Sequence, residues 1–378
     1  MSQSVTRVLI TGANGFIGKN LLVRLSELPD MAVSTFVRGD DAAYLSALVA
    51  QADAVVHLAG ENRPADKAAF AQVNAGLTQA LCHALRTEAA ATGRKLPLLL
   101  ASSTQAERDN PYGRSKLAAE QAVQALAQEV GNQVAVFRLP GVFGKWCKPN
   151  YNSVVATFCY NLARGLPIQI NDPAADVQLV YVDDVVSAFV NAVQAPQSGF
   201  GFAQVQPQYA IKLGELAEQI KAFDACRGAD LQTERVGTGL VRALYATYVS
   251  YLPNERFSYE VPQYGDARGV FVEMLKTPDC GQFSYFTAHP GITRGGHYHH
   301  TKTEKFLVMK GQALFRFRHL LTNELVELRT SADKPQVVDT IPGWTHDITN
   351  VGEDEMVVML WANENFDRQK PDTVASKV

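Results

Sequence analysis

The sequence predicts a doubly wound parallel α/β domain followed by a C-terminal all-β domain. Three observations lead to this expectation. A short apolar strand at residues 7–11 runs into a glycine-rich turn and an amphipathic helix at 16–28. Strand-like and helix-like patterns then alternate, which is typical of βαβ units in a parallel sheet. In the last third, short strand-like runs follow one another without long helices, which favours a β-sandwich or barrel.

Length and composition predict a globular protein of two domains. The chain has 378 residues, 47% of them hydrophobic and 19% charged, which is too long for one typical core. A net charge of −3 without a Lys/Arg cluster gives no reason to expect a nucleic-acid partner. The five cysteines form no C-x-x-C pair, so no disulfide framework is expected. Without a signal peptide or a membrane-spanning apolar run, the expected location is cytoplasmic and no membrane partner is expected.

The other elements follow from apolar runs, helical periodicity and turn residues. We assign residues 1–245 to the α/β domain, with a substrate-binding lobe from about 149, and residues 254–378 to the all-β domain. Strands of the first domain are expected at 32–37, 54–58, 96–101 and 133–137, with helices such as 68–86 and 115–130 between them. Strands of the second are expected at 270–275, 282–288, 304–309, 313–318, 324–329, 336–339 and 356–361.

Residues 11–18, with the sequence T-G-A-N-G-F-I-G, predict a dinucleotide-binding loop of the Rossmann type. Gly12 permits the tight turn, Gly15 lets the backbone approach a pyrophosphate, and Gly18 lets the helix pack against the sheet. The helix N-terminus favours an anion. The alternative is a strand–helix turn that merely needs glycine. The cofactor-binding residues expected in this loop are Gly12, Asn14, Gly15, Phe16, Ile17 and Gly18.

Arg38 follows the second expected strand, where an acidic residue would hold a ribose hydroxyl of the cofactor. An arginine there can instead pair with a 2′-phosphate, which favours NADPH. Asp40 and Asp41 lie nearby and blur this assignment. A solvated surface arginine is the alternative.

Tyr112 and Lys116 lie four residues apart at the start of an expected helix, so their side chains share one face. The preceding strand ends near Ser103 and Thr104, at the edge of a parallel sheet where ligands bind. A neighbouring ammonium and a positive nicotinamide would both favour the phenolate form of Tyr112, whose ordinary pKa is about 10. Tyr112 would then donate a proton to a ketone oxygen as hydride arrives, and a hydroxyl donor would polarise the same carbonyl.

The first 245 or so residues resemble the extended short-chain dehydrogenases/reductases that act on nucleotide sugars. The resemblance lies in the glycine loop, the H-L-A-G segment at 57–60, Asn74, and Y-V-D-D-V at 181–185. It implies that Leu58, Ala59 and Gly60 join the cofactor site. It also implies that Tyr112 is the acid/base and Lys116 its partner, with Ser103 first and Thr104 second as the hydroxyl donor.

A separate cluster in the last third predicts a metal site. Three imidazoles and one carboxylate suit a divalent transition metal. Two histidines of an H-x-H pair alternate along a strand and point to one face, whereas His300 points the other way. Histidines that are merely satisfied polar residues are the alternative. The expected ligands are His297, His299, Glu304 and His346, within a pattern that also includes Gly291, Gly311, Gly343 and Asn350.

This pattern resembles the first cupin motif, which implies a cupin barrel holding one divalent metal per chain. Zinc is the metal that the resemblance implies, and iron is the rival because His-rich cupins also serve oxygenases. The second motif departs from the cupin pattern, since Ile341 occupies the usual proline position and Pro342 follows it. The segment D-A-R-G at 266–269 resembles the start of sugar-epimerase cupins.

The pairing of the two domains resembles a family of bifunctional bacterial capsule and O-antigen enzymes. Segments 143–153, 365–367 and 370–373 add to the likeness. The family implies a UDP-linked 4-keto-6-deoxy-N-acetylhexosamine substrate. The cupin would invert C3, and the reductase domain would then reduce C4 with NADPH. The product would be a UDP-N-acetyl-L-talosamine-type sugar for N-acetyl-L-fucosamine synthesis. We also expect a homodimer.

Two other functions stay open at this point. The chain could be a single-activity 4-keto-sugar reductase whose cupin only mediates dimerisation and whose metal is structural. It could instead be a non-catalytic NADP-binding sugar sensor, although the intact Tyr112 and Lys116 argue against this.

Overall fold

The computed structural model forms two compact units, Met1–Ser153 with Gln178–Ala210, and Val154–Val177 with Ile211–Val378. The expected division of the chain at 245–254 stays a prediction; residue 245 lies inside a helix of the second unit. Cys280 and segments 267–268 and 365–367 lie outside the described residues. The structure describes residues 5–62, 70–228, 231, 233–261, 263–266, 269–272, 274–275, 281–364 and 369–378.

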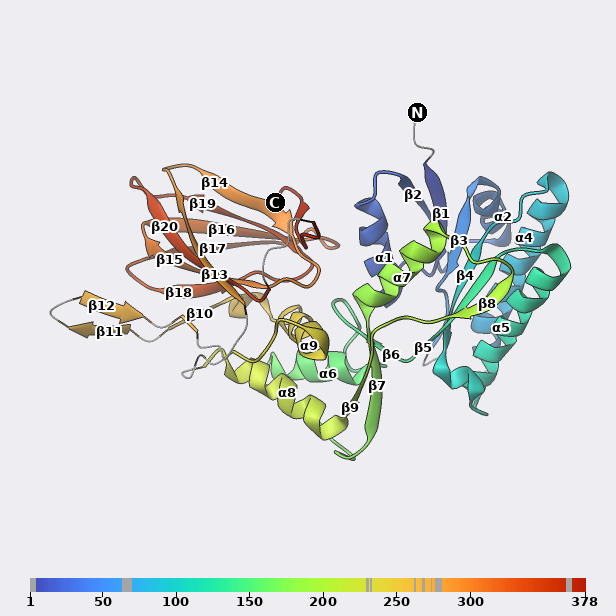
Figure 1. Ribbon diagram of the computed structural model, residues 1–378, viewed down its shortest axis with the longest axis horizontal. Helices are drawn as coiled ribbons and strands as arrows, with labels where there is room; N and C mark the ends of the chain where they lie inside the picture. Colours follow the sequence, from blue (N-terminus) through green and yellow to red (C-terminus); the bar gives the residue numbers. More distant parts are fainter. Residues whose placement is uncertain are drawn as a thin grey trace. The chain divides into compact units, whose positions relative to one another are not determined.

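The first unit is built on a six-stranded parallel sheet, as the alternating pattern predicts (Figure 1). Its central strands are continuous apolar runs, because helices cover both faces of the sheet. Val8, Leu9 and Ile10 are fully buried. In spatial order the strands are β2 (Met31–Phe36), β1 (Thr6–Thr11), β3 (Ala54–His57), β4 (Leu98–Ser103), β5 (Val134–Leu139) and β8 (Phe200–Ala203).

Helices cover the two faces of this sheet in separate groups (Figure 1). One face carries α1 (Phe16–Ser26) and α7 (Val182–Gln194), which contact each other. The opposite face carries α2 (Ala42–Gln51), α4 (Leu77–Thr92) and α5 (Pro111–Val130), and the π-helical turn η1 (Ala71–Gly76) leads into α4. This arrangement confirms the doubly wound α/β class.

Helix α5 begins at Pro111, four residues before the predicted start. The side chain of Asn110 caps it by accepting a hydrogen bond from the backbone N–H of Gly113 at 2.8 Å. A proline suits the first helical position, because its missing N–H has no partner there anyway. The consequence is that Tyr112 lies in the first turn of the helix.

The strand order reverses between β1 and β3, so the switch point of the sheet lies at their carboxyl ends. Gly12 follows β1 with φ of 74°, in the left-handed region that favours glycine. A Cβ atom on Gly12 would lie 2.6 Å from the backbone nitrogen of Ala59, just beyond β3. The glycine loop and the 58–60 segment therefore meet where this fold binds ligands.

Shorter elements complete the helical part of the chain. Three strands form a small sheet in the order β6 (Gly141–Phe143), β7 (Asp176–Tyr181) and β9 (Gln208–Lys212). Within the second unit, three helices pack together, as the helix-rich pattern of that region indicates: α6 (Val154–Leu162), α8 (Leu213–Ala225) and α9 (Gly239–Val249). Two single turns are η2 (Thr104–Glu107) and η3 (Asn254–Arg256).

The rest of the second unit is all-β, which confirms the predicted class. Phe306 of one sheet lies 5.7 Å from Phe315 of the other, measured between ring centroids, so the two sheets share one core. The first sheet has the order β10 (Ser258–Glu260), β18 (Gln336–Asp339), β15 (Glu304–Lys310), β20 (Met356–Ala362) and β13 (Gln282–Ala288). The second has the order β17 (Leu325–Ser331), β16 (Gln312–His319), β19 (Trp344–Asn350), β14 (Thr293–Tyr298) and β21 (Val374–Ala375), and β11 (Gln263–Asp266) pairs with β12 (Gly269–Val272).

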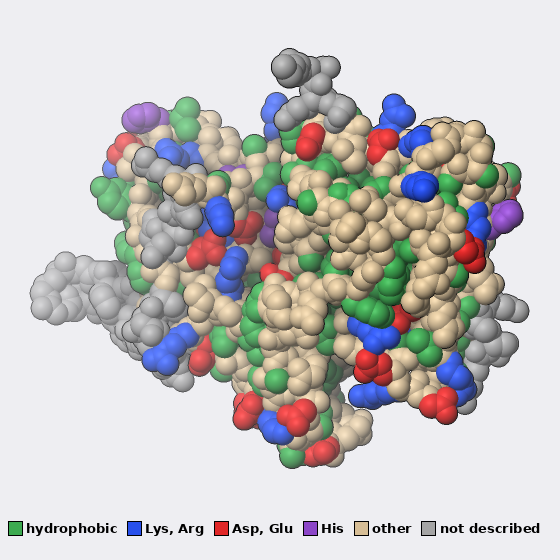
Figure 2. Space-filling model, turned by 45° about the vertical axis from the view of Figure 1, so that its right-hand side comes forward, with side chains coloured by type: hydrophobic (Ala, Val, Ile, Leu, Met, Phe, Trp, Pro, Cys, Tyr) green, Lys and Arg blue, Asp and Glu red, His purple; other side chains and the backbone are tan. Residues whose placement is uncertain are grey.

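On the face drawn in Figure 2, Lys and Arg side chains are interspersed with Asp and Glu rather than gathered in one patch. Among the described helices, none is long and apolar enough to cross a membrane.

Candidate active and metal sites

The start of α1 is built to receive an anion. Gly15 precedes the helix, and its N–H donates to the carbonyl of Gly12 at 2.9 Å, which closes the turn. No side chain of the described chain caps this helix, and its first turn carries no acidic residue. A Cβ on Gly18 would lie 2.6 Å from the Gly12 carbonyl oxygen, so only glycine allows this close packing. The uncapped N–H groups fit a cofactor pyrophosphate.

Arg38 follows β2 and is 85% exposed, but it is not free. Its Nη2 lies 2.7 Å from Oε2 of Glu61, which follows the 58–60 segment. Glu61 was not among the residues expected from the sequence. Asp40 and Asp41 have local roles instead: Asp40 accepts from the Val37 N–H, and Asp41 caps α2. A 2′-phosphate at Arg38 would have to compete with the Glu61 carboxylate.

Three predicted catalytic residues come together at the carboxyl end of β4. Ser103 ends β4, and its hydroxyl is hydrogen-bonded to the Tyr112 hydroxyl. The Lys116 Nζ lies 6.0 Å from the Tyr112 ring centroid and donates to the Ala101 carbonyl at 3.1 Å. Thr104 is exposed and begins η2, so it is not part of this group.

Burial controls the proton affinities of this site. It lowers the pKa of the Lys116 ammonium to about 8, against an opposing effect of the Glu120 carboxylate. It raises the pKa of Tyr112 above its usual value, and the hydrogen bond with Ser103 only partly offsets this. This rise in pKa disfavours the phenolate form of Tyr112, whereas the sequence led us to expect that the phenolate would be favoured. Tyr112 therefore keeps its proton, which is the form that a proton donor needs.

Neighbouring polar side chains hold this constellation in place. The Asn74 Nδ2 donates to Ser115 Oγ at 2.9 Å and to the carbonyl of Glu61 at 3.2 Å. His57, the last residue of β3, bridges the hydroxyls of Thr11 and Thr78 at 2.5 and 2.8 Å. Burial lowers the pKa of His57 to about 3, so its imidazole is neutral. His57 thus acts as a structural link beneath the glycine loop.

The four predicted metal ligands converge in the all-β unit. His297 lies on β14, His299 just beyond that strand, Glu304 at the start of β15, and His346 on β19. One potential ligand atom from each lies within 4.8 Å of all the others. His297 and His346 are directly paired across β14 and β19, with ring centroids 4.7 Å apart. His300 is outside this group, as expected.

Charge and hydrogen bonding in the cluster fit a divalent cation. Both ring nitrogens of His346 are buried without a hydrogen-bond partner among the described residues, and its Nε2 is 3.7 Å from Glu304. Burial lowers the pKa of His346 and brings that of His297 to about 4. Although burial opposes it, the neighbouring His299 and His346 side chains hold the pKa of Glu304 well below its usual value. Neutral imidazoles and an ionised carboxylate are the forms that bind metals.

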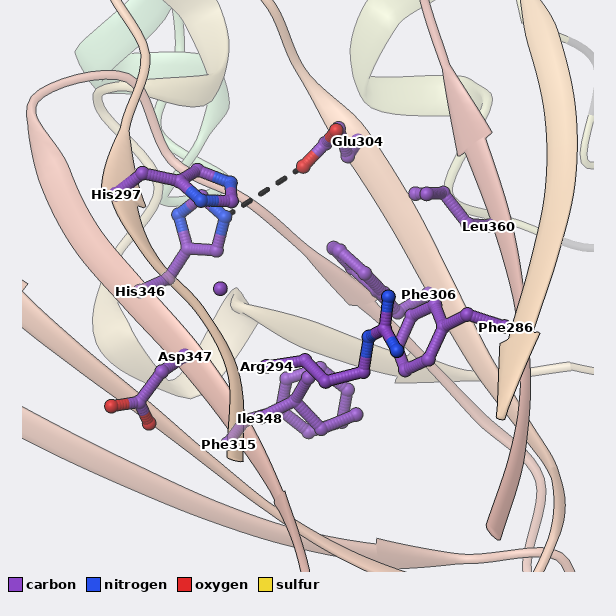
Figure 3. A pocket seen from close by; sticks show the side chains of 11 residues that line it. Phe286, Arg294, His297, Glu304, Phe306, Phe315, His346, Asp347, Ile348 and Leu360 are labelled. Atoms are coloured by element: carbon purple, nitrogen blue, oxygen red, sulfur yellow. Dashed lines mark ion pairs between the residues drawn. The ribbon is translucent and has the colours of Figure 1, made fainter. Parts of the chain in front are cut away.

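A cavity of ≈ 180 Å³ opens beside the cluster (Figure 3). His297, His346 and Glu304 lie at one end of it, and aromatic side chains and Arg294 line the rest. The Arg294 guanidinium stacks over Phe286 at 5.0 Å. An apolar pocket with a few convergent polar groups is the usual form of a small-molecule site.

The second motif departs from the cupin pattern at Ile341, but this departure does not displace the expected ligand His346 from the cluster. Ile341 is buried, and Gly343 adopts φ of 86° in the turn before β19. The Gly343 N–H donates to the carbonyl of His299, so this turn is tied to the first motif. Asn350 is structural, because its amide donates to the carbonyls of Ala288 and Asp354.

Comparison with known proteins finds relatives for both parts of the chain. Residues 8–205 match the NAD dependent epimerase/dehydratase family, and residues 264–374 match the polysaccharide biosynthesis C-terminal domain. A relative from Pseudomonas aeruginosa strain PA103, UDP-2-acetamido-2,6-beta-L-arabino-hexul-4-ose reductase, is 56% identical over 372 residues. The match covers 98% of this chain and 99% of that protein.

Solved structures agree with this match. The capsular polysaccharide assembling protein CapF from Staphylococcus aureus is 43% identical, with a TM-score of 0.66 over 98% of this chain and 100% of that chain. A structure of CapF with the inhibitor 3-isopropenyl-tropolone is 38% identical, with a TM-score of 0.62 over 99% and 100%.

Proposed function

Because the chain belongs to the NAD dependent epimerase/dehydratase family, we propose that its first unit reduces C4 of a UDP-linked 4-keto-6-deoxy-N-acetylhexosamine. The observation that carries this proposal is the Tyr112–Ser103 hydrogen bond beside the buried Lys116, at the carboxyl edge of the sheet. The whole-length likeness to a UDP-hexulose reductase supports the substrate class.

The chain's own residues handle the proton of this reaction. A bound nicotinamide supplies the hydride. Ser103 donates a hydrogen bond toward the C4 oxygen, and Tyr112 gives that oxygen its proton as negative charge develops there. The Lys116 ammonium lies close enough to stabilise the phenolate that remains. Asn74 ties the start of α5, through Ser115, to Glu61, which follows the 58–60 segment.

NADPH is the proposed cofactor, held by Gly12, Asn14, Gly15, Phe16, Ile17, Gly18 and the 58–60 segment. Arg38 is the residue that would contact its 2′-phosphate, since the guanidinium follows β2 and projects into solvent. The exposed pair with Glu61 is weak enough to be replaced by a phosphate contact.

We further propose that the all-β unit inverts C3 of the same sugar before reduction. A ketone at C4 acidifies the C3 proton, so inversion needs a base and an electrophile near that ketone. A bound divalent metal, with zinc the first choice, would act as the Lewis acid. His297, His299, Glu304 and His346 would hold it, and the adjoining cavity would receive the sugar. The product would be a UDP-N-acetyl-L-talosamine-type sugar. That the chain forms a homodimer stays a prediction.

One experiment tests both steps. The purified protein is incubated with the 4-keto sugar in deuterated water, with and without NADPH, and followed by NMR. We expect deuterium at C3 without NADPH, and a C4 alcohol only when NADPH is present. The Tyr112→Phe variant serves as the control for reduction. A C4 alcohol without any C3 deuterium would contradict the epimerisation step. C3 exchange with no consumption of the NADPH that is supplied would contradict the reduction step.

A further inference from the structure

The residues 372–376 lie against the metal cluster although they are distant from it in sequence. The Asp372 carboxylate accepts hydrogen bonds from three consecutive backbone N–H groups. These are His300 at 2.9 Å, Thr301 at 2.7 Å and Lys302 at 2.7 Å. The Thr301 hydroxyl adds a fourth at 3.1 Å. One side chain thus holds the whole loop that joins the ligands His299 and Glu304.

The backbone of Asp372 also determines which nitrogen of His299 is available. Its carbonyl oxygen is hydrogen-bonded to Nδ1 of His299. A carbonyl can only accept, so this contact requires the proton on Nδ1, and in the neutral ring the lone pair that can bind a metal is then on Nε2. That Nε2 is the nitrogen facing Glu304, at 3.2 Å from its carboxylate oxygen. The contact therefore selects the tautomer whose free nitrogen points into the cluster.

The same segment reaches the other ligands. Strand β21 pairs with β14, where Ala375 lies opposite His297. The Ser376 N–H donates to the Gly296 carbonyl at 2.9 Å, and its hydroxyl accepts from Thr345, the neighbour of His346, at 2.9 Å. Lys302 Nζ bridges Thr373 Oγ1 at 3.0 Å and Glu304 Oε1 at 3.5 Å.

We propose that residues 372–376 form a strap that positions the metal ligands, with Asp372 as its main positioning residue. The inference rests on the metal centre of the proposed function. Partners that orient metal-bound histidines typically change metal affinity about 10–100-fold when removed. A segment that only stabilised the fold would change the free energy of unfolding without changing metal affinity or ligand geometry.

The test compares Asp372→Asn with the unaltered full-length chain. The asparagine keeps the size of the side chain but places an NH₂ group against N–H donors, so the 300–302 loop loses acceptors. Asp333→Asn, an exposed position in the same unit, is the matched control. Metal is removed with a chelator, and zinc affinity is measured by competition with a chromophoric chelator. The visible spectrum of the cobalt form reports ligand geometry, and NADPH binding checks the rest of the chain.

We expect Asp372→Asn to weaken zinc binding about 10–100-fold and to alter the cobalt spectrum, while Asp333→Asn and NADPH affinity stay unchanged. If Asp372→Asn does not fold, Thr373→Val takes its place. This variant removes only the Lys302 contact, and we expect a loss of several-fold. Unchanged zinc affinity with an unchanged cobalt spectrum overturns the strap while leaving the metal centre intact. If the unaltered chain binds no zinc, the metal centre and the strap are both overturned.

Discussion

Lys116 shows how a residue of the proposed active site can lower the stability of the fold. Its side chain is almost fully buried, and its Nζ donates a hydrogen bond to the Ala101 carbonyl. Burial disfavours the charged form, so the folded-state pKa falls from 10.5 to about 8. At neutral pH the lysine is nevertheless protonated, and the folded chain carries the cost of a buried charge. The role that we propose for Lys116 beside Tyr112 would account for keeping this buried lysine.

We therefore expect Lys116→Met to abolish reduction yet raise the free energy of unfolding at pH 7. The shift from 10.5 to about 8 corresponds to a gain of up to about 3 kcal/mol, less the lost hydrogen bond. The sign follows from proton linkage. Below pH 8 Lys116 is protonated in both the folded and the unfolded wild-type chain, so the variant has its full gain in stability. As the pH rises from 8 toward 10.5, wild-type Lys116 loses its proton in the folded state and the gain shrinks.

Urea unfolding followed by circular dichroism at several pH values measures this difference. Lys95→Met, at an exposed position of the same unit, is the control and should change little. A Lys116→Met protein that is less stable than wild type at pH 7 would contradict the account.

The Arg38→Asp variant should shift cofactor preference from NADPH toward NADH. The substitution removes the proposed 2′-phosphate contact and sets a second carboxylate beside Glu61, which repels phosphate. The measurement is the ratio of kcat/KM for the two cofactors. Arg86→Asp, which also breaks an exposed pair, is the matched control. An unchanged ratio would show that another basic residue discriminates.

At the residue scale, the sequence predicted well what depends on local spacing. Gly12, Tyr112 and Lys116 lie where the pattern puts them, because a glycine turn and one helix face fix their positions. Glu61 was missed because it meets Arg38 only through the pairing of β1, β2 and β3. Ser103 could not be separated from Thr104, since the choice depends on where β4 ends and η2 begins.

At the scale of elements, a buried ionic network links the end of helix α8 to the β-sheets of the same, second unit. Asp339 on β18 pairs with Arg227, which follows α8, and with Lys305 on β15 at 2.8 Å. Lys305 also donates to the Tyr259 hydroxyl of β10 at 2.9 Å. Burial alone would lower the pKa of Lys305, but Asp339 outweighs it and raises that pKa well above its usual value.

Replacing Asp339 with Asn should lower the free energy of unfolding by about 3–5 kcal/mol, because two buried cations lose their counter-charge. Urea unfolding of metal-free protein, followed by the fluorescence of Trp146, Trp344 and Trp361, measures the loss. A variant with Arg227→Met, Lys305→Met and Asp339→Leu together removes all the charges and should be less destabilised than the single variant. A single variant as stable as wild type would mean that the network contributes little.

Sequence patterns predicted most strands of this unit but not its closing segment. β15, β16 and β20 are long apolar or alternating runs, which give a strong signal. β21 has only two residues, and it pairs with β14 because Asp372 anchors the chain just before it. A strand defined by an anchor rather than by its own composition leaves no periodic signal.

At the scale of the whole molecule, the two proposed reactions share one functional group. The C4 ketone acidifies C3 while it persists, and it disappears on reduction. Inversion must therefore precede reduction. A reductase that acted first would trap the sugar in the wrong configuration. The two chemistries should then be separable by point variants of the intact chain, without a cut at 245, which would end the chain inside α9.

We expect two variants to fail at different steps and to complement each other. Tyr112→Phe should lose at least about 99% of NADPH oxidation, because it lacks the proton donor, yet keep zinc and C3 exchange. A His299→Ala and His346→Ala double variant should bind NADPH but lose zinc and C3 exchange. It should also fail to oxidise NADPH with the uninverted sugar, since no inverted ketone reaches its reductase site.

Mixing the two proteins should restore NADPH oxidation, because Tyr112→Phe releases the inverted ketone and the double variant can reduce it. Circular dichroism confirms that both are folded, and each protein alone at doubled concentration is the control. The mixture distinguishes this scheme from a single-activity reductase, in which the double variant would oxidise NADPH unaided at the wild-type rate. A folded pair that stays inactive when mixed would mean that the sugar is not exchanged between the two sites through solution.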